Sequence, residues 1–297
     1  MKRIAVCGGS GFIGAALVRE LSKNPANAIM WSMSREHCDL RLPMHCEQFV
    51  RRAEVVYMCA GVTGGSGLIA SDPLSLVTPN VLMHLHLFDA CKRAGVKKVI
   101  CLSSTTGYPD TDLPMSEEDY FLGELHPAYF NPGNARRFIE RLGAMYPELN
   151  IVFLRPSVVY GPGDNFDPET SHVIPALVRK VAERQNPITI WGDGSNWRDG
   201  VYIDDMVRAL LLAADAPAGA YNIASGEGMT VTEMWKVLVL HANNFIAHPP
   251  IFDTSKPAML KKRVLAIDKA RRVMGWEPKI PMPYGLKLTL DVYAKSL

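Results

Sequence analysis

Three glycines near the amino terminus have a spacing that suits phosphate binding. They recur every third residue, directly after a short apolar run and before a segment with helical periodicity. Glycine permits a tight turn and a close approach of backbone to a pyrophosphate, and the helix start adds free N–H groups and a positive dipole end. In this context the pattern predicts a dinucleotide-binding loop and not only a structural turn. The residues expected to form it are Gly8, Ser10, Gly11, Phe12, Ile13 and Gly14.

A second group of chemistry-bearing residues consists of hydroxyl side chains. Ser104 and Thr106 follow the apolar run Val96–Leu102, and Tyr129 lies just before a predicted helix. Ligands of parallel sheets bind outside the carboxyl ends of the strands, so this turn is expected to face a bound ligand. A serine there can hydrogen-bond a substrate hydroxyl or carbonyl oxygen.

The end of the second predicted strand bears on the choice of dinucleotide. NAD-binding proteins usually place an acid there for the ribose hydroxyls, but Ser34 and Arg35 precede the first acid, Glu36. A guanidinium pairs well with a 2′-phosphate, so we expect NADP(H) in preference to NAD(H). The alternative is that Arg35 is only a solvated loop charge.

Composition excludes several classes of protein. The 297 residues contain 32 Lys+Arg and 30 Asp+Glu, so a strongly basic nucleic-acid binder is excluded. No apolar run approaches the roughly 20 residues of a membrane span. The six cysteines lack metal-ligand spacing, so we expect no metal site and buried thiols in a reducing compartment, the cytoplasm.

The predicted elements alternate between strands and helices, which implies βαβ units and a parallel sheet. The expected strands are Ile4–Cys7, Ala28–Trp31, Glu54–Cys59, Val96–Leu102, Ile151–Leu154, Ile188–Trp191, Val201–Ile203 and Ala220–Ile223, of which the last two are expected to return to the main sheet. The expected helices are Phe12–Ser22, one with Thr78 as N-cap and Pro79 at its first position, Pro132–Tyr146, Val173–Glu183, Asp204–Ala214, Thr232–Leu240 and Pro283–Ala294.

Longer motifs resemble the extended short-chain dehydrogenase/reductase family of nucleotide-sugar epimerases, dehydratases and reductases, and within it the GDP-L-fucose synthase subgroup. The likeness covers essentially the whole chain. The segments that carry it are the glycine loop, Cys101–Tyr108, Arg155–Phe166, Ser171–Leu177, Gly192–Asp205 and Phe252–Pro257.

The resemblance implies a Rossmann-type doubly wound parallel sheet with a smaller α/β substrate domain at the carboxyl end. It places the cofactor domain at residues 1–160, with 201–225 returning to it, and the substrate domain at 161–200 and 226–297. It also implies a homodimer. The expected substrate is a nucleotide diphosphate sugar, GDP-linked, and the expected cofactor is NADP(H).

The resemblance also assigns roles to single residues. It implies catalytic roles for Ser104, Thr106, Tyr129 and His172. Beyond the glycine loop, it implies cofactor contacts from Ser34, Arg35, Asp39, Leu40, Ala60, Gly61, Tyr129, Pro156 and Val158. It implies substrate contacts from Asn165, His172, Arg179, Lys180, Trp191, Arg198 and Arg263.

Two positions depart from the family pattern. The motif Tyr-x-x-x-Lys reads Tyr129 to Gly133, so the lysine that lowers the tyrosine pKa is replaced, with Arg136 or Arg137 as possible substitutes. Thr106 stands where the synthases have a cysteine base, and a threonine hydroxyl is far too weak an acid to replace it. The sequence therefore predicts a C4 reductase or epimerase, with a catalytically impaired binding protein as the alternative. A dehydratase lacks support because the turn has no acidic pair.

Overall fold

The fold was taken from a computed structural model of the chain. It describes residues 2–31, 38–64, 66–243, 245–256, 260–262 and 264–297. Six all-parallel strands form the central sheet in the order β2-β1-β3-β4-β5-β9. They are β1 (Lys2–Cys7), β2 (Asn27–Trp31), β3 (Val55–Met58), β4 (Lys98–Leu102), β5 (Val152–Pro156) and β9 (Gly219–Ile223).

The strand order reverses at β1, which has β2 on one side and β3 on the other. Ligands of open α/β sheets bind in the crevice outside the carboxyl ends of the strands at such a switch point. The loops after β1 and β3 therefore form the expected binding edge, and the loop after β4 lies next to them.

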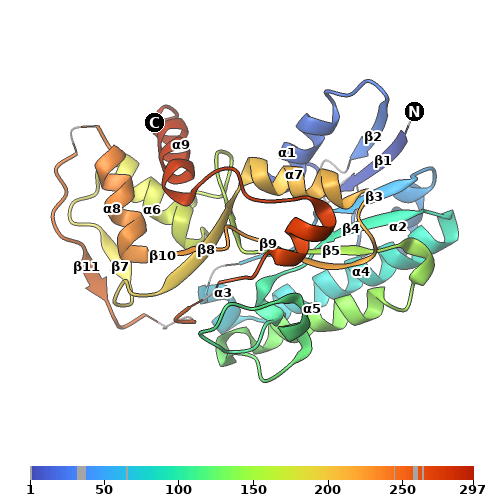
Figure 1. Cartoon of the computed structure of the whole chain (residues 1–297), viewed down its shortest axis with the longest axis horizontal. Coiled ribbons are helices and arrows are strands. Elements are labelled where there is room, and N and C mark those ends of the chain that lie inside the picture. Colours follow the sequence, from blue (N-terminus) through green and yellow to red (C-terminus); the bar gives the residue numbers. More distant parts are fainter. Residues whose placement is uncertain (1, 32–37, 65, 244, 257–259, 263) are drawn as a thin grey trace.

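Alternate residues of β1 face two separate cores. Ile4 and Val6 pack with helices α1 (Phe12–Leu21) and α7 (Ile203–Ala213). Ala5 and Cys7 pack with α2 (Pro43–Val50), α4 (Leu74–Ala94) and α5 (Phe130–Gly143). Figure 1 shows α1 and α7 on one side of the sheet and α4 and α5 on the other. The predicted doubly wound α/β fold is thus confirmed, and burial on both faces explains why the strands read as continuous apolar runs.

Two helix starts differ from the sequence prediction. The start at Thr78 and Pro79 is wrong, because α4 begins at Leu74 and holds Pro79 inside. This proline removes one backbone N–H donor, but the extension buries Leu76, whose carbonyl oxygen accepts a 2.6 Å bond from the Asn80 side chain.

The helix predicted over Pro132–Tyr146 is α5, which begins earlier, at Phe130, with Tyr129 at the N-cap position. Pro132 falls within the first turn of α5, where backbone N–H groups lack intrahelical partners and a proline is tolerated.

The carboxyl-terminal half builds a second layer of structure beside the main sheet (Figure 1). It contains β6 (Val158–Tyr160), β7 (Thr189–Trp191), β8 (Trp197–Tyr202), β10 (Gly228–Thr230), β11 (Ile251–Asp253), and helices α6 (Val173–Ala182), α8 (Val231–His241) and α9 (Met282–Ala294). Strand β8 pairs with β6 and β10, so the expectation that Val201–Ile203 joins the main sheet is wrong. Strand β8 pairs instead with β6, a strand that was not predicted from the sequence. The other expected strand, Ala220–Ile223, lies within β9 and does join the main sheet.

The remaining described elements are short connections. They are the helix α3 (Ser66–Ser71), the π-helical turn Ala270–Met274, and the 3₁₀ turns Thr105–Gly107, Glu117–Phe121, Pro127–Tyr129 and Pro147–Leu149. Across the described ranges no helix is long and apolar enough to cross a membrane. The expected division at residues 160, 200 and 225 stays a prediction.

Candidate active site

The glycine loop forms a tight turn that only glycine can make. Gly8 has φ +74°, and a Cβ atom on it would lie 2.7 Å from the backbone of Ala60. A Cβ atom on Gly14 would lie 2.0 Å from the Gly8 carbonyl oxygen, whereas one on Gly11 would meet that oxygen only at 3.4 Å. Gly8 and Gly14 are therefore required for packing, and Gly11 leaves the backbone open at the loop surface.

The start of α1 offers an anion site beside this turn. Gly11 is its N-cap residue, and no side chain of the described part of the chain caps the helix. The first backbone N–H groups of a helix lack internal partners and attract negative charge. The residues present therefore fit the pyrophosphate of a dinucleotide, with Ala60 and Gly61 at the adjoining end of β3.

Several predicted cofactor contacts have other environments or cannot be placed. Ser34 and Arg35 lie outside the described residues, so the preference for NADP(H) stays a prediction. Leu40 is buried in the core, and the Asp39 carboxylate pairs with Arg41 at 2.6 Å. Pro156 and Val158 lie where β5 ends and β6 begins, both half-buried.

Ser104 lies at the carboxyl end of β4 with an oriented hydroxyl. Its Oγ accepts hydrogen bonds from the backbone N–H of Thr106, at 3.2 Å, and from the Thr106 hydroxyl, at 3.1 Å. A hydroxyl that accepts two bonds directs its own proton elsewhere. This turn can therefore donate a hydrogen bond from Ser104 to a ligand oxygen.

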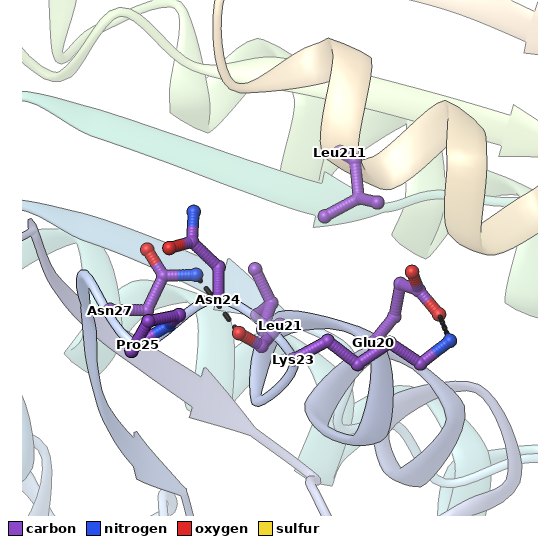
Figure 2. Close-up of a pocket in the computed structure, with 7 residues that line it drawn as sticks. All are labelled: Glu20, Leu21, Lys23, Asn24, Pro25, Asn27 and Leu211. Atoms are coloured by element: carbon purple, nitrogen blue, oxygen red, sulfur yellow. Dashed lines mark hydrogen bonds and ion pairs between the residues drawn. The ribbon is translucent and has the colours of Figure 1, made fainter.

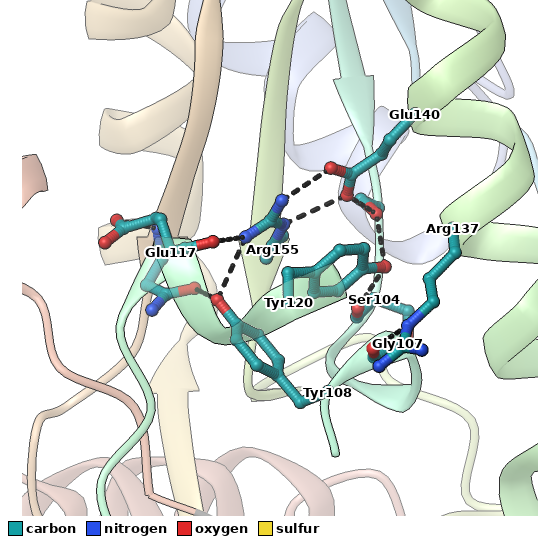
Figure 3. Close-up of polar contacts among 10 residues, drawn as sticks. Ser104, Gly107, Tyr108, Glu117, Tyr120, Arg137, Glu140 and Arg155 are labelled. Atoms are coloured by element: carbon teal, nitrogen blue, oxygen red, sulfur yellow. Dashed lines mark hydrogen bonds and ion pairs between the residues drawn. The ribbon is translucent and has the colours of Figure 1, made fainter. Parts of the chain in front are cut away.

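A buried polar network packs against this turn (Figure 3). The Tyr120 hydroxyl donates to the Ser104 carbonyl oxygen at 3.1 Å, and the Ser103 hydroxyl donates to Glu140 at 2.5 Å. Arg155, inside β5, donates to both Glu140 carboxylate oxygens, at 3.0 and 2.6 Å, and lies 3.6 Å from the Tyr120 ring centre. This network was not predicted from the sequence. An arginine inside the apolar strand Val152–Pro156 was the signal for it.

Tyr129 faces the second half of the protein. It is half-buried at the N-cap of α5, after the turn Pro127–Tyr129. Its phenol interacts electrostatically with the guanidinium of Arg198, whose pKa is lowered mainly by desolvation. Arg198 also donates to the carbonyl oxygens of Trp197 and Leu260, at 2.7 and 2.8 Å. The structure therefore brings a predicted catalytic residue and a predicted substrate residue together.

The two arginines near Gly133 have different partners. Arg137 donates to three carbonyl oxygens, those of Gly107, Leu122 and Gly123, at 2.8, 2.7 and 3.2 Å. Arg136 has one long contact, 3.5 Å to the Leu102 carbonyl oxygen at the end of β4. Arg137 thus links α5 to the segments around Gly107 and Leu122 by hydrogen bonds. Arg136 is the arginine whose side chain reaches the carboxyl end of β4.

The other predicted substrate residues lie on or near α6. His172 is the N-cap residue of α6, and desolvation lowers the pKa of its imidazole. Asn165 donates to Thr170 at 2.9 Å within its loop. Arg179 pairs with Glu183 at 3.0 Å, and Lys180 donates to the Thr189 carbonyl oxygen at 2.6 Å.

The remaining two predicted substrate residues are on other segments. Trp191 is exposed at the end of β7, with the Lys256 ammonium 5.2 Å from its ring centre. Arg263 lies outside the described residues. The described chain holds no group of three or more potential metal-ligating His, Cys, Asp or Glu residues.

A surface hollow elsewhere in the molecule does not belong to this site. Glu20, Leu21, Asn24, Asn27 and Leu211 contribute to its lining (Figure 2). It lies where α1 ends and β2 begins, and thus at the amino end of the parallel strands. Ligands of this fold bind at the opposite, carboxyl edge.

The fold and this edge define a dinucleotide-binding α/β protein. Residues 4–224 match the NAD dependent epimerase/dehydratase family, and the chain belongs to that family. It is 30% identical to the GDP-L-fucose synthase of Sinorhizobium fredii over 310 residues, covering 100% of this chain and 96% of the relative. It is 24% identical to the GDP-L-colitose synthase of Yersinia pseudotuberculosis, covering 98% and 97% of the two chains.

Solved structures share the fold over the full length. A UDP-glucose 4-epimerase from Thermotoga maritima superposes with a TM-score of 0.88 at 26% identity, covering 99% of both chains. A GDP-6-OMe-4-keto-L-xylo-heptose reductase from C. jejuni superposes with a TM-score of 0.91 at 22% identity, covering 100% and 98%. The predicted family and its Rossmann-type fold are therefore confirmed.

Proposed function

We propose that the protein is an NADP(H)-dependent reductase of a nucleotide diphosphate 4-keto sugar, GDP-linked as in the curated relatives. The observation that carries the proposal is the Ser104 hydroxyl, which accepts two hydrogen bonds from Thr106 at the carboxyl end of β4. A fixed donor at this edge suits a carbonyl oxygen that gains negative charge during reduction. Full-length similarity to GDP-sugar enzymes supports the substrate class.

Each residue then has a role in the reaction. When bound at the glycine loop, a nicotinamide cofactor would supply the hydride. Ser104 donates a hydrogen bond to the C4 carbonyl oxygen of the sugar, and Tyr129 delivers the proton to that oxygen. Arg198, beside Tyr129, stabilises negative charge on the phenol and on the substrate diphosphate.

We propose reduction without inversion at the neighbouring carbons C3 and C5. Removing a proton from those carbons needs a base, and the Thr106 hydroxyl is already donating to Ser104. Returning a proton needs an acid, and the lowered pKa of His172 reduces its protonated fraction at neutral pH. His172 then serves substrate binding. Inversion at C4 through a transient ketone is the variant of this proposal that the same residues support.

A second candidate is a catalytically impaired protein that binds cofactor and nucleotide sugar. The observation that favours it is Gly133, where the backbone contact with Thr106 leaves no room for a lysine side chain.

Two further proposals, on oligomeric state and on cellular compartment, accompany either function. Exposed Leu85 on α4 and Phe138 on α5 support a homodimer, and six unpaired cysteines support a reducing compartment such as the cytoplasm.

The test combines the protein with NADPH and a panel of GDP- and dTDP-linked 4-keto-6-deoxysugars. We expect loss of reduced-cofactor absorbance with one GDP-linked member. In D₂O, NMR should detect no deuterium at C3 or C5 of the product, whereas epimerisation would introduce it. Firm NADPH binding without turnover of any member would favour the impaired binding protein, and binding of neither ligand would overturn both candidates.

A further inference from the structure

Arg136 adds a second positive charge beside the Arg155–Glu140 ion pair at the cofactor edge of the sheet. Its side chain is half-buried, and it forms no ion pair within the part of the chain that the structure describes. The nearest carboxylate, Glu140, is occupied by both nitrogens of the Arg155 fork and by Ser103. Glu140 also attracts Arg136, but its single negative charge is shared with Arg155, so the three side chains together keep one positive charge. A partly buried charge without an ion pair of its own favours a negative or polar ligand.

The other titratable neighbours of Arg136 are uncharged at neutral pH. His84, packed behind it on α4, is neutral, because burial first and the charge of Arg136 second lower its pKa to about 3. Tyr120 and Cys101, the other titratable groups near Arg136, stay protonated because burial raises the pKa of each. The site therefore keeps a net positive charge at neutral pH.

The position of the guanidinium connects it to the glycine loop. A Cβ atom on Gly61 would lie 3.8 Å from Nη2 of Arg136 and 3.5 Å from Oδ1 of Asn80. The Asn80 side chain fixes the segment after β3: it accepts a hydrogen bond from the Val62 N–H at 3.1 Å and donates one to the Val62 carbonyl oxygen at 2.8 Å. Because the backbone of Ala60 lies against Gly8, Arg136 lies along the same sheet edge as the glycine loop. Its contact with the Leu102 carbonyl oxygen places it at the end of β4, beside the turn that carries Ser104.

We propose that Arg136 is the positive charge at the nicotinamide end of the cofactor site, and that it selects the reduced cofactor. The inference rests on the proposed function. The reduced ring is neutral and the oxidised ring is cationic, while the ribose and phosphate groups are shared. A nearby guanidinium therefore repels only the oxidised form, which favours NADPH entry, NADP⁺ release, and operation in the direction of sugar reduction.

The test measures the dissociation constants of NADPH and NADP⁺ by calorimetry for the wild type, Arg136→Met, Arg136→Gln and Arg136→Lys. We expect the ratio of the NADP⁺ constant to the NADPH constant to fall by about tenfold in the two uncharged variants, as for a partly screened charge pair, and to recover in Arg136→Lys. Arg141→Met is the matched control, because Arg141 stacks on Phe121 at the surface of the same helix. It should leave the ratio unchanged.

The outcomes separate this inference from the proposed function. An unchanged ratio in both uncharged variants overturns the role of Arg136 even if the wild type reduces a sugar. Binding of neither dinucleotide by the folded wild type overturns the proposed function, and this inference with it. Arg136→Gln retains a donor for the Leu102 carbonyl oxygen, so it keeps the test valid if Arg136→Met fails to fold.

Discussion

Gly133 packs against the backbone of Thr106 so closely that a Cβ atom on the glycine would lie 2.4 Å from the Thr106 carbonyl oxygen. The first turn of α5 therefore rests directly on the turn that carries Ser104. A side chain at position 133 would also meet Leu125 at 2.8 Å. The glycine at position 133 is thus a packing requirement of this chain, and we propose that the cation expected near Tyr129 comes from another residue.

We predict that Gly133→Ala lowers the free energy of unfolding. Alanine favours a helix over glycine by about 1 kcal/mol, but overpacking against backbone costs about 1–3 kcal/mol and cannot be relieved by a side-chain rotation. Gly133→Lys should be destabilised further and should not gain activity. Denaturant unfolding measures the change. Gly67→Ala is the control, since no atom lies within 4 Å of a Cβ atom there. A Gly133→Lys variant with higher turnover than the wild type would contradict this account.

The sequence predicted the parallel sheet well because its strands are buried on both faces. Val55–Met58 is buried at every position, and such a strand reads as an uninterrupted apolar run. The small sheet was harder to predict. Strand β6 has only three residues and pairs with β8, which begins only after residues 161–196, so local periodicity carries no sign of this pairing.

The site was predictable where a motif has a local cause and was not where it depends on packing. The turn of the glycine loop depends on glycine positions that can be read directly from the sequence, whereas its role in cofactor binding stays a prediction. Which of Arg136 and Arg137 lies near the expected cofactor site depends on which loops pack against α5. Arg137 meets the carbonyl oxygens of Leu122 and Gly123, which only the folded chain brings to it.

We predict that Thr106→Val slows reduction while folding is retained. Valine keeps the shape of threonine but removes the hydroxyl that donates to Ser104 at 3.1 Å. Losing one orienting hydrogen bond of about 1 kcal/mol should lower kcat about fivefold. Thr106→Ser keeps the donor and is the matched control. Steady-state kinetics with the identified sugar measures the effect, and equal kcat values for Thr106→Val and the wild type would show that Thr106 does not orient Ser104.

We predict that Tyr129→Phe abolishes most of the reduction without weakening cofactor binding. The phenol hydroxyl is the proposed proton donor, and loss of a positioned general acid typically costs about 10²–10⁴-fold in rate. NADPH affinity should be retained. Single-turnover absorbance measurements separate the chemical step from binding. Tyr284→Phe, on the exposed surface of α9, serves as the control. A Tyr129→Phe variant with wild-type rate would assign proton delivery to another group.

Asp199 connects β8 to the loops that follow β9 and β11. Its carboxylate accepts bonds from the backbone N–H and hydroxyl of Ser225, at 2.8 and 2.7 Å, and from the backbone N–H of Leu265 at 3.3 Å. The side chain is almost completely buried, and burial raises its pKa from the ordinary value near 3.8 to about 7. Between about pH 3.8 and pH 7, Asp199 is therefore protonated in the folded chain and ionised in the unfolded chain.

We predict that this carboxyl makes stability fall as pH rises from 4 to 7. Because its folded pKa is raised, its contribution is fully present below about pH 4 and is lost as pH rises through 7, with a slope of up to about 1.4 kcal/mol per pH unit. Asp199→Asn cannot titrate, so the unfolding free energy of the wild type minus that of the variant should decline over this range and level off above it. Urea unfolding at several pH values measures this difference, with Asp112→Asn at the surface as the control. A difference that stays constant from pH 4 to 8 would mean that Asp199 is ionised throughout and that its hydrogen bonds outweigh its burial.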